Sequence, residues 1–164
     1  MRVLGIDPGS SRTGFGVLDA CPGRGAGEAV LVDAGVIRAG RGAMAARLAR
    51  ILEGLERVLA EHHPAEVAME EVFHAKNARS ALVLGQARGV ALAAAGRAGL
   101  TVYEYAPSRV KLTVTGHGAA AKEQVRRVLA LCLGAAPEEL DASDAVGIAL
   151  CHLRWRGGGK AGLR

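Results

Sequence analysis

Residues 2–19 read RVLGIDPGSSRTGFGVLD, and this stretch sets the class of fold that the chain can adopt. Residues 2–7 are a short apolar run that ends at a Pro-Gly turn, a pattern that predicts a strand. Residues 13–19 predict a second strand, whose two glycines allow another backbone to approach closely. Asp7 therefore stands at the end of a strand, where α/β proteins often place their functional sites.

The next segments extend this pattern and then change its period. Residues 30–37 predict a third strand, and the short connections between the first three strands favour an antiparallel meander. Residues 44–60 switch to helical spacing. The apolar stripe of this predicted helix is formed by Leu48, Leu52, Leu55 and Leu59.

Strands and helices alternate in the remainder of the chain. Strands are expected at residues 66–70 and 101–105, and helices at 78–97, 107–114, 120–133 and 141–156. This alternation implies parallel strands joined by right-handed crossovers. The expected fold is therefore α/β, a five-stranded mixed sheet flanked by helices in a single domain over residues 1–156. Three glycines open a tail, residues 157–164, which is expected to be disordered.

The composition excludes several classes of protein. Of the 164 residues 50% are hydrophobic, too many for a disordered chain, yet the longest uncharged apolar run is too short to cross a bilayer. The three cysteines lack the CxxC spacing of a zinc site, and their odd number argues against a disulfide framework. An acid interrupts the N-terminal apolar run, which argues against a signal peptide. A cytoplasmic location is expected.

The net charge of +5 is unevenly distributed along the sequence. Residues 72–137 carry nine basic and two acidic side chains, whereas residues 138–150 carry four acidic side chains and no basic one. A basic surface beside clustered carboxylates suits a metal-dependent enzyme that acts on nucleic acid. A solvated basic surface with an unrelated acidic helix start is the alternative on charge alone.

Four carboxylates could meet in one site. Asp7 and Glu70 each end a predicted strand, and Asp141 and Asp144 lie three residues apart on one face of the last helix. Like charges this close raise one another's pKa, and an oxygen-preferring cation, Mg²⁺ or Mn²⁺, relieves the repulsion. Such a site can hold two ions about 4 Å apart and hydrolyse a phosphodiester. Each residue taken alone is more typical of a turn or a helix cap.

The predicted helix at 78–97 is apolar almost all round, with only Gln86 and Arg88 strongly polar between its first and last turns. Such a helix needs cover on more than one side. Small residues recur every four positions from Gly85, which would allow a second helix to approach closely. We therefore expect a symmetric dimer through this helix, with a fully internal helix in a monomer as the alternative.

Sequence blocks distributed along the whole chain carry a family resemblance. They are GIDPGSSRTGFG (residues 5–16), EEVFHAKN (70–77), SAL (80–82), LGQARG (84–89), YAPSRVK (105–111), VTGHG (114–118), AKEQV (121–125), DASDA (141–145) and IA (148–149). In this order they resemble the RuvC family of bacterial Holliday-junction resolvases, from residue 5 to about residue 152.

The resemblance implies a fold, a site and an activity. The fold is RNase H-like, with three antiparallel and two parallel strands. Asp7, Glu70, Asp141 and Asp144 are implied as the Mg²⁺-binding catalytic tetrad. The activity is that of a homodimer that nicks two strands of a four-way DNA junction symmetrically in recombination and repair, leaving 5′-phosphate and 3′-hydroxyl ends. The partners implied are the branch-migration proteins RuvA and RuvB.

The resemblance also points to residues that contact DNA. Phe73, one of two phenylalanines, would stack on an unpaired base near the junction centre, and the neighbouring Lys76 would contact phosphate. Lys111 and Lys122 match basic family positions that approach the DNA backbone. Three of the four lysines of the chain lie in these motifs, whereas arginine supplies most other positive charge. This indicates that a compact ammonium is needed at these positions.

Rival functions fit the sequence less well. An ATPase of the actin-like class needs two lobes and an adenosine site, for which the chain leaves no room. A DNA-binding module without catalysis does not need four carboxylates. The alternative that stays open is another RNase H-like nuclease with a different substrate, such as an RNA–DNA hybrid.

Overall fold

A computed structural model gives the fold of the chain and describes residues 1–21, 28–71 and 77–158. The strands are β1 (Arg2–Asp7), β2 (Arg12–Ala20), β3 (Ala29–Arg38), β4 (Glu66–Glu70) and β5 (Val102–Tyr105). The helices are α1 (Met44–His62), α2 (Ala78–Arg97), α3 (Pro107–Thr115), α4 (Lys122–Leu133) and α5 (Leu140–Gly158).

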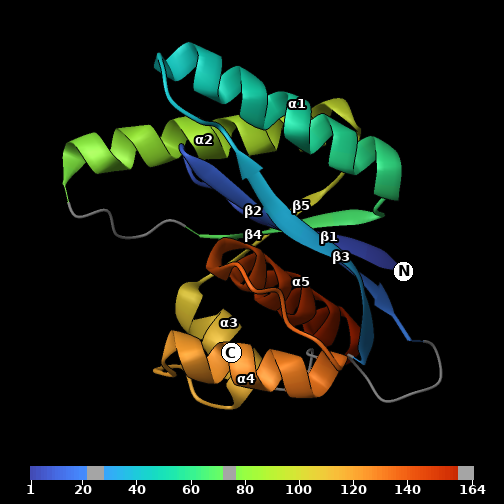
Figure 1. Cartoon of the computed structure of the whole chain (residues 1–164). Coiled ribbons are helices and arrows are strands. Elements are labelled where there is room, and N and C mark those ends of the chain that lie inside the picture. Colours follow the sequence, from blue (N-terminus) through green and yellow to red (C-terminus); the bar gives the residue numbers. More distant parts are fainter. Residues whose placement is uncertain (22–27, 72–76, 159–164) are drawn as a thin grey trace.

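The strands form one mixed sheet in the order β3-β2-β1-β4-β5 (Figure 1). β1, β2 and β3 make the expected antiparallel meander, whereas β4 and β5 run parallel to β1. The chain passes through α1 before β4 and through α2 before β5, so each parallel strand is added by a helical crossover. The predicted five-stranded mixed sheet is confirmed.

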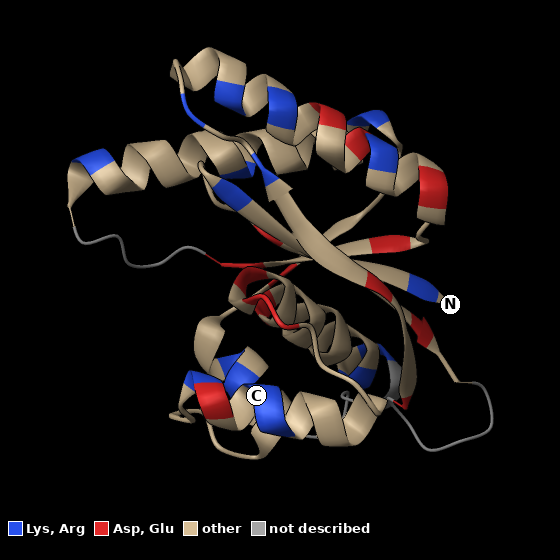
Figure 2. Ribbon diagram, in the orientation of Figure 1, with Lys and Arg blue, Asp and Glu red and all other residues tan. Residues whose placement is uncertain are grey.

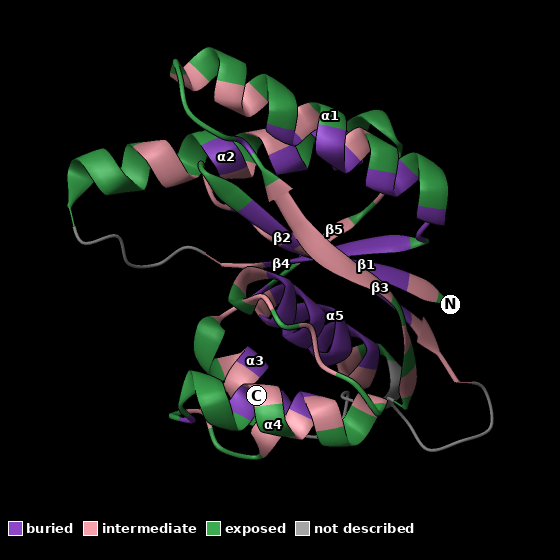
Figure 3. Cartoon of the chain, in the orientation of Figure 1, coloured by how far each residue is buried: buried purple, intermediate pink, exposed green. Residues whose placement is uncertain are grey.

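Helices cover both faces of the sheet. α1 and α2 lie on one face, and α3, α4 and α5 lie on the other (Figure 1). Alternation along β1 sends Leu4 and Ile6 into the core beneath α1 and α2, and Val3 into the core beneath α5. Figure 3 shows that α5 is buried along most of its length, because it lies between the sheet and the helices α3 and α4.

The buried face of α1 differs from the predicted stripe. Leu55 and Leu59 are buried, but Leu48 is only half-buried, and Ile51 and Val58 extend the buried surface instead. Leu52 is half-buried as well. α1 contacts both β3 and α2, so its apolar face is a wider band than a single row of leucines.

The helix α2 is not internal to the chain. Its buried residues are Ala87, Ala91, Ala94 and Ala95, and its first half is largely exposed (Figure 3). The alternative of a fully internal helix is therefore wrong for the single chain. No helix within the described residues is long and apolar enough to cross a lipid bilayer.

Several helix ends also depart from the predictions by one or two residues. α5 continues through Gly158, so two residues of the expected tail belong to the helix, and residues 159–164 lie outside the described residues. Adding residues to an existing helix costs much less than starting one, which explains the longer final turn. α4 begins at Lys122 rather than at residue 120.

Candidate active site at the carboxyl ends of β1 and β4

Asp7 and Glu70 lie at neighbouring strand ends on the same face of the sheet. Ile6 pairs with Met69 in the parallel β1–β4 ladder, so Asp7 and Glu70 follow side by side at the carboxyl ends. Ile6 and Met69 face the core beneath α1 and α2. Because side chains alternate along a strand, the two carboxylates face α5.

Glycines let the beginning of α5 lie directly on the strands. A Cβ atom added to Gly14 would lie 1.9 Å from the carbonyl oxygen of Asp141, and one added to Gly5 would lie 2.1 Å from that of Ala145. No side chain other than hydrogen fits at these positions. The close contact holds the beginning of α5, with Asp141 in its first turn and Asp144 one turn further along the same face, beside the ends of β1 and β4. Figure 2 shows acidic residues gathered where β4 ends and α5 begins.

The electrostatics show that neighbouring carboxylates raise the pKa values of Asp7 and Glu70. Burial, and after it the charges of Asp144, Glu70 and Asp141, raise the pKa of Asp7 to about 7. The pKa of Glu70 is also raised, first by burial and then by the charge of Asp144. Negative charge is therefore concentrated at this edge of the sheet.

Two cationic side chains partly offset that charge. Lys122 Nζ lies 2.7 Å from Asp144 Oδ2, and this hydrogen bond raises the pKa of the lysine. Arg12 Nε lies 2.6 Å from Asp141 Oδ2. Lys111 and Lys122 line a cleft together with Glu70 and Asp144, so both predicted lysines lie beside the carboxylates.

The carboxyl end of β4 is further held by α2. Arg88 NH1 donates a 2.8 Å hydrogen bond to the carbonyl oxygen of Glu70, and the same guanidinium pairs with Glu104 at the neighbouring strand. This explains one of the two strongly polar residues in an otherwise apolar helix. It also restrains the backbone that carries the Glu70 carboxylate.

The donor set suits a divalent cation of the Mg²⁺ type. All four candidate ligands are carboxylates, and hard cations prefer such oxygen ligands. Within the described residues, no group of three or more acidic, histidine or cysteine side chains lies close enough together to enclose an ion. Asp141 and Asp144 are instead engaged by Arg12 and Lys122. The side chains are thus brought to one place, but they are not arranged as a closed ligand shell.

The structure leaves two predicted DNA contacts without a description and adds residues that the sequence did not reveal. Phe73 and Lys76 lie outside the described residues. Arg12 contacts Asp141 and also forms an ion pair with Glu139. Neither Arg12 nor Glu139 was predicted from the sequence to belong to the site. Arg12 lies 129 residues from Asp141, so no local pattern could have connected the two.

Comparison with known proteins identifies the family. A family model described as "Crossover junction endodeoxyribonuclease RuvC" matches residues 3–152, which include all four candidate carboxylates. The chain belongs to the RuvC family. This confirms the resemblance and the predicted class of enzyme.

Individual RuvC proteins are similar to this chain over most of their length. A crossover junction endodeoxyribonuclease RuvC of Anaeromyxobacter sp. (strain K) is 54% identical over 156 residues, covering 95% of this chain and 82% of the relative. The RuvC of Methylococcus capsulatus is 52% identical over 156 residues, covering 94% and 92%. The solved structure of Thermus thermophilus RuvC in complex with a Holliday junction substrate has a TM-score of 0.89 and 36% identity, and covers 97% of this chain and 96% of that one. The RNase H-like resolvase fold is confirmed.

Proposed function

We propose that this chain resolves four-way DNA junctions by metal-dependent hydrolysis of phosphodiester bonds, with Asp7, Glu70, Asp141 and Asp144 as the catalytic carboxylates. The single observation that carries the proposal is the convergence of these acids at one edge of the sheet. They come from two neighbouring strand ends and one helix start, in a chain of the RuvC family. Such convergence of like charges is costly in a protein that does not use it.

The four carboxylates are proposed to hold Mg²⁺, with Mn²⁺ as a substitute and two ions in each site. When bound, such cations supply Lewis-acid activation of water and stabilisation of the leaving oxygen. Asp7 and Glu70 are placed by the sheet and do not depend on flexible loops, which favours a fixed ligand geometry. Asp141 and Asp144 complete the proposed set from the beginning of α5.

Lys122 and Lys111 are proposed to act on the DNA phosphates. Lys122 already lies 2.7 Å from Asp144, so its ammonium can stabilise the charge that develops at a phosphate held by the carboxylates. Lys111 lines the same cleft and would fix the position of the backbone. Phe73 and Lys76 are proposed to contact the junction centre and a phosphate, on the resemblance to the family alone.

The chain is further proposed to act as a homodimer through α2. Leu82 is 70% exposed and Leu92 37% exposed on this helix. A Cβ added to Gly85 or Gly89 would meet no atom within 4 Å, so the fold of the single chain does not require glycine there. A second α2 packed on this apolar face would explain both observations and would supply two sites for symmetric nicks. Action in the cytoplasm with the branch-migration proteins RuvA and RuvB is proposed on the resemblance to the family.

The deciding experiment compares substrates. The protein is incubated with a synthetic four-way junction, a linear duplex of the same sequence and an RNA–DNA hybrid, with and without Mg²⁺. We expect paired symmetric cuts in the junction only, only with the metal, and none with Asp7→Asn. Equal cutting of the hybrid would support another RNase H-like nuclease instead, and cutting that survives Asp7→Asn would overturn the proposed site.

A further inference from the structure

Two arginines from neighbouring strands form ion pairs with Glu139, the residue that precedes α5. Arg12 at the start of β2 is the register partner of Arg38 at the end of β3. Arg12 NH2 lies 2.9 Å from Glu139 Oε2, and Arg38 NH2 lies 2.7 Å from Glu139 Oε1. The carbonyl oxygen of Glu139 accepts a 3.0 Å hydrogen bond from the backbone N–H of Ser143 in the first turn of α5. This Arg12–Glu139–Arg38 clamp therefore fastens the beginning of α5 to the β2–β3 edge.

The same Arg12 guanidinium also contacts a candidate metal ligand. Its Nε donates a 2.6 Å hydrogen bond to Asp141 Oδ2 while its NH2 is held by Glu139. Among the described residues, one side-chain hydrogen bond reaches the Asp141 carboxylate, and it is accepted by Oδ2. The planar guanidinium thus orients this carboxylate through one oxygen and leaves Oδ1 for another partner.

We propose that Arg12 is a positioning residue, which holds Asp141 Oδ2 so that Oδ1 would be available to a divalent cation. Glu139 and Arg38 fix Arg12 in turn. The inference rests on the proposed function, because it assigns Asp141 to the metal. Carboxylate ligands of metals are commonly oriented by such outer hydrogen bonds, and removing the outer partner typically costs about 10- to 100-fold in metal affinity or activity.

The solvent exposure of the clamp allows a positioning role of Arg12 to be distinguished from a role in stabilising the fold. The side chains of Arg12, Glu139 and Asp141 are 47%, 38% and 33% exposed. Ion pairs this exposed add little to the stability of a fold. Loss of Arg12 should therefore leave the melting temperature nearly unchanged but weaken the binding of the cation. A structural anchor would show the opposite pattern.

The test uses the full chain with Arg12→Gln, Arg12→Lys and a matched control. Arg2 forms an ion pair with Asp19 through Nε and NH2, with both side chains 35–37% exposed, and Arg2→Gln removes a similar contact far from the carboxylates. Mn²⁺ binding is followed by electron paramagnetic resonance without DNA. Junction cleavage is measured as a function of Mg²⁺ concentration, and junction binding is measured without metal.

We expect Arg12→Gln to raise the half-saturating Mn²⁺ and Mg²⁺ concentrations about 10-fold, with near-normal cleavage at high metal concentration. Arg12→Lys should recover only part of the affinity, because an ammonium lacks the planar fork. Arg2→Gln should leave metal binding unchanged. Junction binding without metal should be the same in all three variants.

Other outcomes would overturn the inference and leave the proposed function intact. Unchanged Mn²⁺ binding in Arg12→Gln would show that Asp141 needs no orientation by Arg12. Tighter Mn²⁺ binding would show that Arg12 competes with the cation. Weaker junction binding with unchanged metal affinity would assign Arg12 to a DNA phosphate. Failure of the proposed function is distinguishable, since it would appear as junction cleavage that persists in Asp7→Asn.

Discussion

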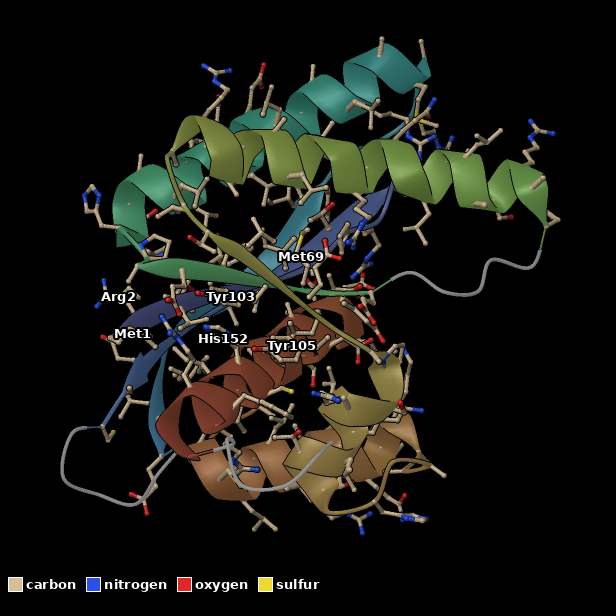
Figure 4. The ribbon with its side chains drawn as sticks, turned by 180° about the vertical axis from the view of Figure 1, so that it is seen from behind. Met1, Arg2, Met69, Tyr103, Tyr105 and His152 are labelled. Atoms are coloured by element: carbon tan, nitrogen blue, oxygen red, sulfur yellow. The ribbon has the colours of Figure 1, made fainter. Side chains whose placement is uncertain are left out.

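Glu66 Oε2 lies 2.6 Å from His152 Nε2, and this buried contact joins the start of β4 to the second half of α5. Tyr105 Oη lies 2.7 Å from His152 Nδ1, so the same imidazole also holds the end of β5. Figure 4 shows Tyr105 and His152 between β5 and α5. Since Tyr105 is the register partner of Glu70, the network fixes the relative position of the elements that carry the candidate ligands.

Removal of the His152 imidazole should destabilise the fold. His152→Phe leaves the Tyr105 hydroxyl without its partner and removes one partner of the Glu66 carboxylate, which keeps its contact with Arg156. We expect a loss of about 1–3 kcal/mol in the free energy of unfolding. Denaturant titration measures this. His63→Asn is the control, because His63 is exposed at φ 46°, a backbone conformation that asparagine adopts readily. A loss below 1 kcal/mol in His152→Phe would show that water replaces the imidazole.

The same network predicts how stability depends on pH. Burial lowers the pKa of His152 from its ordinary value of 6.5, although Glu66 opposes the shift. Burial alone would raise the pKa of Glu66, but hydrogen bonds from Arg156 and His152 outweigh this effect, so the pKa of Glu66 is lowered. Below pH 6.5 the unfolded chain takes up a proton at His152 that the folded chain takes up less readily, so this stability is complete above pH 6.5 and is lost as the pH falls. The contribution of Glu66 is present above pH 4.5 and is lost below it.

The variant His152→Gln isolates the contribution of His152 to the pH dependence of stability. The raised pKa of Asp7 has the opposite sign, since the folded state gains stability as the pH falls through about 7, and so wild type alone gives a mixed curve. The contribution of Asp7 is the same in both proteins, so it cancels in the difference in melting temperature between wild type and His152→Gln. We expect this difference to be largest above pH 7 and to shrink as the pH falls below 6.5. A difference that stays constant over this range would refute the assignment.

The contact between α5 and the sheet should not tolerate a methyl group at Gly14. An alanine Cβ there would lie 1.9 Å from the carbonyl oxygen of Asp141, so the helix start must move. We expect Gly14→Ala to lose about 3 kcal/mol of stability and most of the cleavage activity. Gly96→Ala is the control, since a Cβ at Gly96 in α2 meets no atom within 4 Å and alanine favours helix. Full activity in Gly14→Ala would show that the position of Asp141 is adjustable.

Local patterns predicted those parts of the site that depend on local geometry. The predicted strand ends placed Asp7 and Glu70 at the edge of the sheet, and helical spacing placed Asp141 with Asp144. Each inference needs only a few neighbouring residues and the period of one element. The strands and helices followed the same logic, and their ends differ from the predictions by at most two residues, as at Gly158.

Contacts between distant segments could not be predicted in this way. Glu66 and His152 are separated by 86 residues, and Lys122 and Asp144 by 22. Whether such pairs form depends on how the helices pack on the sheet, which leaves no periodic trace in the sequence. The wide buried band of α1 was missed for the same reason, because it reflects two packing partners rather than one.

The apolar face of α2 predicts a dimer that a single charge disrupts. Leu82 is 70% exposed in the single chain, so Leu82→Glu should leave the fold intact but place charges against each other in a paired α2 interface. We expect a shift from dimer to monomer in light scattering and loss of paired nicks. Leu131→Glu on α4 is a matched control, with 79% exposure at the native leucine. A wild-type chain that is monomeric at all concentrations would contradict the proposed interface.

Lys122 should contribute to the cleavage step more than to binding. Its ammonium lies 2.7 Å from Asp144 Oδ2, at the edge of the cleft that also contains Glu70. We expect Lys122→Gln to lower the single-turnover cleavage rate about 100-fold at saturating Mg²⁺, because a positive charge beside the reacting phosphate is lost. Junction binding, measured by fluorescence anisotropy, should weaken by only about threefold, the effect of one phosphate contact. Lys122→Arg should recover binding but not the rate, because the broad guanidinium does not replace a compact ammonium. If binding and rate instead fall together and both return in Lys122→Arg, Lys122 serves only to hold the DNA backbone.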